Sequence, residues 1–195
     1  IMAGLGKYLF GTGDRVGKEG RAQLKALLHA RENGVKVTPV WNKSHREHET
    51  VGSKPHMVRE EADAAVKSLN FTGKYFVDAD HINLNIVDPY LPVSNFFTID
   101  VADYIGKNSA EKEKDEFLKF TARFQQEINI PGISKNFKIP ETKLNEILET
   151  FLYASKKASE VYRYIKENKS EEFVVEVSMD EVENPQTPEE LFFVL

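Results

Sequence analysis

The most restrictive feature of the sequence is the alternation of short strand patterns with helix patterns along most of its length. Runs rich in β-branched and aromatic residues are separated by longer segments whose apolar residues recur at helical spacing. The predicted strands are 8–10, 35–40, 75–77, 96–100 and 173–179, and the first two predicted helices are 18–32 and 57–70. Strands that alternate with helices form a parallel sheet joined by right-handed crossovers. The predicted fold class is therefore α/β.

Two architectures accommodate five parallel strands of this kind. One is a small doubly wound sheet, and the other is the first part of a TIM-type (β/α)8 barrel, which typically needs about 250 residues. Near the end of the chain, Thr187 is a predicted N-cap, Pro188 takes the first helical position and Glu190 completes a capping box. A helix therefore begins shortly before the sequence stops at Leu195. We interpret the chain as part of a barrel and expect it to be incomplete.

A long helical segment separates the fourth predicted strand from the fifth. Pro140 opens its second helix in the favoured first position, and the first helix has an apolar face formed by Phe117, Phe120, Phe124 and Ile128. Because the segment is much longer than an ordinary βα connection, we expect a helical hairpin that either covers the site or mediates assembly into a homo-oligomer. The predicted organisation is the first (β/α) units over 1–108, the hairpin insertion over 109–170 and a further (β/α) unit over 171–195.

The composition restricts the partners of the chain. Its formal net charge of −5 argues against a nucleic-acid partner, which would require a basic face. The chain has no cysteine, so disulfides and thiolate chemistry are excluded. No apolar run approaches the ~20 residues that span a bilayer, and the first residues do not have the pattern of a signal peptide. We therefore expect a soluble cytoplasmic protein without a nucleic-acid or membrane partner.

Two predicted strands run directly into acidic side chains. Asp78, Asp80 and His81 follow the third strand, and Asp100 ends the fourth, with Asp103 close behind. In parallel α/β folds, catalytic groups lie at the carboxyl ends of the strands. Asp80 is a potential base, and the adjacent His81 is a potential metal ligand. The alternatives are that these carboxylates cap turns or helices and that His81 is a surface histidine.

The loop after the first strand contains the glycine motif Gly11-Thr12-Gly13-Asp14-Arg15-Val16-Gly17. A strand, a Gly-x-Gly motif and a helix can form a dinucleotide cradle. Here the third glycine lies one residue too far along, and the second strand is not followed by the acid that would bind a ribose hydroxyl. The loop is then either an anion site beside Arg15 or a plain tight turn.

Two histidines, His45 and His48, lie in a polar segment over 41–55 that we predict to be a loop. Their spacing could place two metal ligands on one side of a helix, but on a loop it carries little information. We favour a solvated or substrate-facing loop over a metal site.

Several short motifs in a fixed order give the chain a resemblance to a known family. They are Phe10-Gly11-Thr12-Gly13-Asp14-Arg15, Asp78-Ala79-Asp80-His81, Phe96-Phe97-Thr98-Ile99-Asp100, Met179-Asp180-Glu181 and Thr187-Pro188-Glu189-Glu190. Together they resemble the tagaturonate/fructuronate epimerase family, metal-dependent enzymes of bacterial hexuronate breakdown. The resemblance implies that Asp80 is the proton acceptor, His81 a metal ligand and Glu181 the proton donor. It also implies a divalent cation (zinc, nickel or manganese) with further histidine ligands beyond the matched region.

The reaction implied by this resemblance interconverts D-tagaturonate and D-fructuronate by inverting C4 of a keto-hexuronate. C4 is β to the ketone, so simple enolisation cannot reach it, whereas retro-aldol cleavage and re-formation of the C3–C4 bond can. Transient oxidation by NAD is the competing mechanism, and the glycine motif does not favour it. Two other functions remain open: another metal-dependent sugar aldolase or isomerase that uses the same strand ends, and a non-catalytic assembly module built on the helical hairpin.

Overall fold

The computed structural model divides the chain into two compact units. The first comprises Ile1–Ile99 with Val161–Val177, and the second comprises Asp100–Glu160 with Ser178–Leu195. The described residues are 5–124, 127–129, 132, 134, 136–179 and 185–194. No helix in these ranges is long and apolar enough to cross a bilayer. The fold is α/β, as the alternation of patterns predicts.

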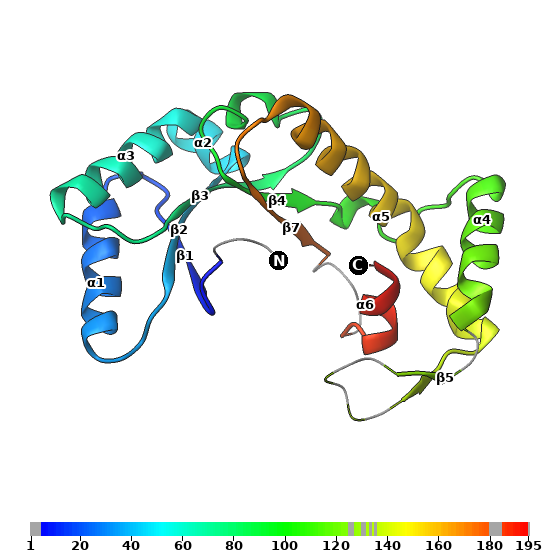
Figure 1. The fold of residues 1–195 in the computed structure, drawn as a ribbon. Coiled ribbons are helices and arrows are strands. Elements are labelled where there is room, and N and C mark those ends of the chain that lie inside the picture. Colours follow the sequence, from blue (N-terminus) through cyan, green and yellow to red (C-terminus); the bar gives the residue numbers. More distant parts are fainter. Residues whose placement is uncertain are drawn as a thin grey trace. The chain divides into compact units, whose positions relative to one another are not determined.

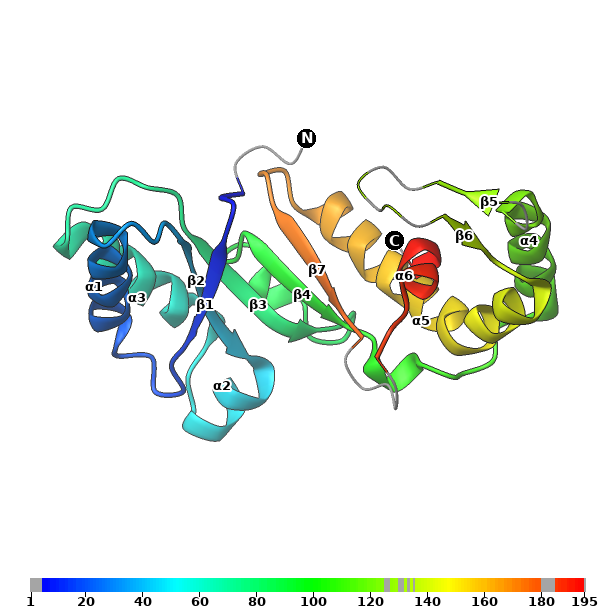
Figure 2. The same cartoon turned by 90° about the horizontal axis from the view of Figure 1, so that it is seen from below.

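The frame of the first unit is a five-stranded sheet with the strand order β1-β2-β3-β4-β7 (Figures 1 and 2). The first three pairs in this order are parallel. The last strand joins them through the amide of Val174, which donates to the carbonyl of Asn95 at 3.1 Å. The order of the strands therefore follows the order of the chain. Their bounds are Leu9–Gly13, Thr38–Ser44, Phe76–Ile82, Phe96–Asp100 and Val174–Ser178.

Helices α1 (Gly20–Glu32) and α3 (Pro55–Ser68) cover one face of this sheet (Figure 1). Leu24 of α1 is fully buried against Trp41 of β2 and Val77 of β3. Burying a leucine side chain of this kind contributes about 2 kcal/mol to folding. The apolar stripes of the two helices therefore fix which face of each strand points towards the core.

Helix α2 (His45–Val51) occupies a segment that the sequence analysis assigns to a loop, so that prediction is wrong. Ser44, the last residue of β2, caps the helix by accepting from the amide of Glu47 at 3.3 Å, and the Glu47 carboxylate accepts from the Ser44 amide at 3.2 Å. Ser-x-x-Glu is the signature of a capping box. The strand and the helix therefore adjoin without a loop between them.

The second unit contains α4 (Glu111–Thr121), much of α5 (Glu141–Asn168) and α6 (Pro188–Val194). The ammonium of Lys114 lies 3.0 Å from the Glu149 carboxylate and joins α4 to α5. The two helices of the predicted hairpin and the predicted helix start near Pro188 are thus confirmed. The predicted boundaries of the insertion stay a prediction, because α5 contributes residues to both units.

The first helix of the hairpin ends earlier than its apolar pattern predicts. After α4, a short 3-10 turn (Ala122–Phe124) leads into strand β5 (Glu127–Ile128), which pairs antiparallel with β6 (Phe137–Lys138; Figure 2). The prediction that Ile128 lies on the face of the helix is therefore wrong. Ile128 packs from the strand against a buried cluster that includes Phe137 and Leu144. Its apolar side chain fits the helical spacing in the sequence, but its backbone is part of a strand.

Candidate active site at the carboxyl ends of the strands

The face of the sheet that α1 and α3 leave uncovered changes from apolar to polar along the strands. Trp41 and Val77 point into the helix-covered core, so their neighbours in sequence point the other way. On this second face, the amino-terminal halves of the strands present apolar side chains and the carboxyl-terminal halves present polar ones. The apolar group is Val40, Phe76, Phe96 and Val174, and the polar group is Asn42, Ser44, Asp78, Asp80, Thr98 and Glu176.

Asp80 and His81 form a hydrogen-bonded pair near the end of β3. The Nδ1 atom of His81 lies 2.9 Å from Oδ1 of Asp80, and the side chains are 47% and 16% exposed, respectively. Both residues are predicted to follow the strand, whereas β3 continues through them to Ile82. The pair thus combines a carboxylate with an imidazole that reaches solvent.

Asp78 lies two residues earlier on the same strand and is only 6% exposed. Its carboxylate accepts hydrogen bonds from the amide and the hydroxyl of Thr98 on β4, at 3.1 and 2.9 Å. Burial raises the pKa of Asp78 to about 7 against the opposing effect of Thr98, and the carboxylates of Asp80 and Glu176 raise it further. Asp78 is predicted to follow the strand, but it lies within β3, where its burial is tolerated because Thr98 donates to both of its oxygens.

The ring of Tyr90, in the short 3-10 turn Asp88–Tyr90 after β3, lies near the rings of both histidines of α2. The ring of Tyr90 is 6.0 Å from that of His48 and 6.5 Å from that of His45. Burial raises the pKa of Tyr90 to about 12, and the charges of Asp80 and Glu49 add to this effect. The Tyr90 hydroxyl has no hydrogen-bond partner among the described residues.

His48 itself is buried, and its Nδ1 lies 2.9 Å from the hydroxyl of Ser53. Burial lowers the pKa of His48 to about 4, and the positive charges of Lys43 and His45 lower it further. His48 is therefore neutral at physiological pH and serves as part of the packing. The two histidines do lie on a helix, but the described residues place no third ligand beside them.

In the glycine motif after β1, the side chain of Asp14 accepts hydrogen bonds from backbone amides of the same loop and of the segment just after it. The carboxylate of Asp14 accepts from the amides of Val16, Lys18 and Glu19 at 3.0, 2.6 and 2.6 Å. Burial alone would raise the pKa of Asp14, but these amides lower it overall. Because Asp14 uses the amides that a phosphate would need, the geometry agrees with a tight turn rather than a nucleotide cradle.

Other strand-end residues have more local roles. The Asp100 carboxylate accepts from the amide of Ala102 at 3.0 Å, which is the capping role considered as its alternative. Glu181 lies outside the described residues, so its role as the proton donor stays a prediction.

The described residues do not by themselves make up a divalent-metal site. A carboxylate on one imidazole nitrogen, as Asp80 provides for His81, is the usual partner of a metal-bound histidine. However, no three His, Asp or Glu side chains in the described part of the chain are grouped to hold a metal ion. A typical zinc site needs three or four protein ligands. A metal bound by His81 therefore needs ligands from outside the described residues.

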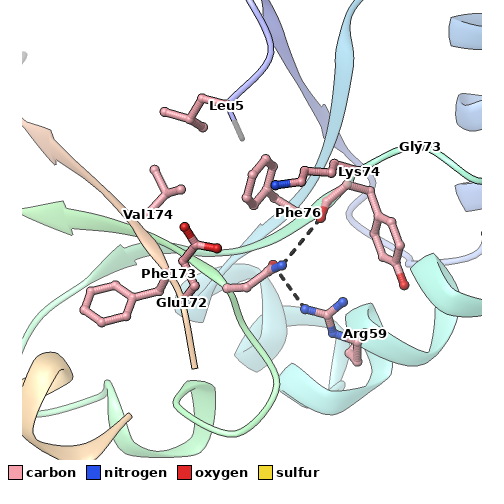
Figure 3. A pocket seen from close by; sticks show the side chains of 10 residues that line it. Leu5, Arg59, Gly73, Lys74, Phe76, Glu172, Phe173 and Val174 are labelled. Carbon is pink, nitrogen blue, oxygen red and sulfur yellow. Dashed lines mark hydrogen bonds between the residues drawn. The ribbon is translucent and has the colours of Figure 1, made fainter. Parts of the chain in front are cut away.

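A cavity of about 400 Å³ lies at the opposite, amino-terminal ends of the strands. Figure 3 shows Leu5, Phe76 and Val174 around this space, with the charged groups of Lys74 and Glu172 directed towards it. The guanidinium of nearby Arg59 is occupied, because it donates to the Val93 carbonyl at 2.8 Å and to the Asn95 side chain at 3.1 Å. The cavity is therefore at the wrong end of the sheet to contain the Asp80–His81 pair.

Comparison with known proteins identifies the family. The tagaturonate epimerase family, UxaE, matches residues 2–195. The tagaturonate/fructuronate epimerase of Thermotoga maritima is 28% identical over 199 residues, which cover 96% of this chain and 40% of that protein. Two crystal structures of the fructuronate-tagaturonate epimerase UxaE from Cohnella laeviribosi, one native and one with one glycerol, share the fold with TM-scores of 0.80 and 0.81 at 19% identity. Each match covers 98% of this chain and 41% of the other. The chain spans about 40% of the length of its relatives, and over that span it belongs to the tagaturonate epimerase family.

Proposed function

We propose that the protein interconverts D-tagaturonate and D-fructuronate by inverting C4 of the keto-hexuronate. The observation that carries this proposal is the family match over 2–195, which includes the strand that bears the Asp80–His81 pair. The polar half of the uncovered sheet face supports it, because strand carboxyl ends are where parallel α/β enzymes place their chemistry.

Asp80 is the base in this proposal. Its carboxylate removes the proton of the C4 hydroxyl, the C3–C4 bond breaks, and the electron pair of that bond forms an enediolate on C2 and C3. The resulting aldehyde turns over and the enediolate adds to its other face. Glu181, the proposed acid, then returns a proton to the C4 oxygen. The hydrogen on C4 stays in place throughout.

His81 would hold a divalent cation, with Asp80 as the hydrogen-bond partner that orients its ring. When bound, such a cation supplies Lewis-acid stabilisation of an enediolate. This metal dependence is a separate proposal from the reaction itself. It predicts that the full-length protein contains a divalent metal and that His81→Ala lowers the metal content measured by mass spectrometry.

We also propose that the sheet continues into a (β/α)8 barrel in the full-length protein. Its strand order follows the chain, whereas a doubly wound sheet reverses its order at a switch point. Both edges expose large apolar side chains that further strands could cover: Tyr8 and Phe10 at β1 are 56% and 55% exposed, and Val177 on β7 is 41% exposed. Such edges are typical of a sheet that pairs with additional strands.

The α4–α5 hairpin is our candidate for a lid or for a homo-oligomer contact. It leaves Phe120 58% exposed, with the Arg123 guanidinium 4.1 Å from the centre of its ring. If the hairpin mediates assembly, Phe120→Glu should lower the mass measured by sedimentation. An unchanged mass together with lower turnover would favour the lid.

The proposed reaction is tested with the full-length protein in D2O, with the product followed by NMR. The retro-aldol route predicts epimerisation without deuterium at C4, whereas removal of the C4 hydrogen as a proton would introduce it. Asp80→Asn should lower turnover by about 10²–10⁴-fold, because the amide keeps the contact to His81 but cannot accept a proton. Asp115→Asn, at an exposed carboxylate on α4, is the matched control. No conversion of any keto-hexuronate by the metal-loaded wild-type protein would refute the proposal.

A further inference from the structure

The contact between Asp80 and His81 requires an irregular strand. In a regular β-strand, consecutive side chains point to opposite faces of the sheet. The carboxylate of Asp80 and the imidazole of His81 are nevertheless 2.9 Å apart. The backbone between them must therefore turn one of the two side chains out of its regular direction.

The irregularity is a β-bulge in β3. Ala79 pairs with Phe97 and Ile82 pairs with Ile99, so two residues of β3, Asp80 and His81, lie opposite one residue of β4. His81 has a φ of 53°, in the left-handed region that residues other than glycine rarely adopt. An outlier of this kind persists only where neighbouring contacts hold it.

The single residue of β4 that faces the bulge is Thr98, and it is held by Asp78. The amide and the hydroxyl of Thr98 both donate to the Asp78 carboxylate, at 3.1 and 2.9 Å. Both side chains are buried, at 5% and 6% exposure. At the position where the bulge shifts the pairing of the two strands, the Thr98 amide therefore donates to the Asp78 side chain.

We propose that Asp78 and Thr98 are positioning residues that hold the bulge of β3 and thereby direct Asp80 and His81 towards the substrate. The part of this inference that concerns turnover rests on the proposed function, in which Asp80 is the base. The part that concerns the backbone does not. Within the described residues, these two hydrogen bonds are the side-chain link that joins β4 to β3 beside the bulge.

A direct chemical role for Asp78 is the alternative, since a buried carboxyl could instead carry a proton to or from Asp80. The two roles differ in what asparagine can replace. In Asp78→Asn the amide oxygen still accepts from the Thr98 amide, and its NH2 can donate to the Thr98 hydroxyl oxygen. The variant keeps the link between the strands and removes the titrating group.

The test compares four variants of the full-length protein by steady-state kinetics. Asp78→Ala and Thr98→Val remove contacts of the link and should lower kcat by about 100-fold with a smaller change in KM, because a misplaced base costs rate more than binding. Asp78→Asn and Thr98→Ser keep the contacts and should restore kcat to within about threefold. Thr121→Val removes a hydroxyl from another fully buried threonine, in the second unit, and is the control for a loss of packing.

Hydrogen exchange gives a readout that does not depend on activity. The peptide that contains the Thr98 amide should exchange faster in Asp78→Ala but not in Asp78→Asn. Near-normal kcat in both Asp78→Ala and Thr98→Val, or unchanged exchange at Thr98 in Asp78→Ala, would overturn the inference. Loss of turnover in Asp78→Asn as large as in Asp78→Ala would assign Asp78 a chemical role instead. An inactive wild-type protein would refute the proposed function, while the exchange data would still decide whether the link exists.

Discussion

Replacing Asp78 by asparagine should stabilise the protein above neutral pH and leave its stability nearly unchanged in acid. Burial raises the pKa of Asp78 from 3.8 to about 7, so the folded protein binds this proton more tightly than the unfolded chain. The contribution of this group to stability is then fully present below about pH 4. It is lost as the pH rises through about 7, because the carboxyl must ionise inside the sheet.

The size of this effect follows from the shift. A shift of about three pKa units, at about 1.4 kcal/mol each, corresponds to roughly 4 kcal/mol lost by pH 8. Asparagine cannot ionise and keeps the contacts to Thr98, so Asp78→Asn should recover up to that amount at pH 8, less than half of it at pH 5 and little below pH 4. Urea unfolding of the wild type and the variant at several pH values measures the difference. The exposed Asp115→Asn change should show no such pH dependence.

A stability difference between wild type and Asp78→Asn that is the same at pH 5 and pH 8 would refute this reasoning. It would mean that Asp78 ionises in the fold as readily as in the unfolded chain. Destabilisation by asparagine at pH 8 would go further and show that Thr98 and the sheet favour the charged carboxylate.

Three further measurements address other parts of the structure. Burial lowers the pKa of His48 to about 4, so its contribution to stability is complete above about pH 6.5 and falls by up to about 3 kcal/mol towards pH 4. In urea unfolding measured at several pH values, His48→Gln should therefore lose less stability in acid than the wild type. Leu144→Ala, at a fully buried position of the second unit, should cost about 2–5 kcal/mol by the same method, and a loss below about 1 kcal/mol would contradict the buried packing. If a barrel closes over Phe10, Phe10→Ala should destabilise the full-length protein by about 3–5 kcal/mol, whereas an open edge would leave the effect small.

The sequence was sufficient to predict elements whose cause is local. The run Phe96–Asp100 is a strand with the predicted bounds, because consecutive β-formers define it without help from distant residues. The same is true of the helix start at Pro188, where the N-cap Thr187 and the capping-box Glu190 are only three residues apart. Ser44 and Glu47 gave the same local signal for α2, and the prediction of a loop there overlooked it.

The features that the sequence did not predict depend on partners far along the chain. Asp78 is tolerated inside β3 because Thr98, twenty residues later, donates to both of its oxygens. The bulge that brings Asp80 and His81 together is a property of the pairing between two strands, which hydrophobic patterns do not encode. The proximity of the two residues could be predicted from their adjacency, but the geometry that lets them touch could not.

The turn after β1 has a consequence for how this part of the molecule responds to its surroundings. The Asp14 carboxylate occupies an anion-binding site made of three backbone amides, and it is covalently attached to the same loop. A tethered group of this kind has an effective concentration in the millimolar range or above, so dissolved phosphate at lower concentrations does not displace it. We therefore expect the conformation of the turn not to change with phosphate below that concentration. Asp14→Gly would remove this carboxylate, and the three amides would then be available to an anion from solution.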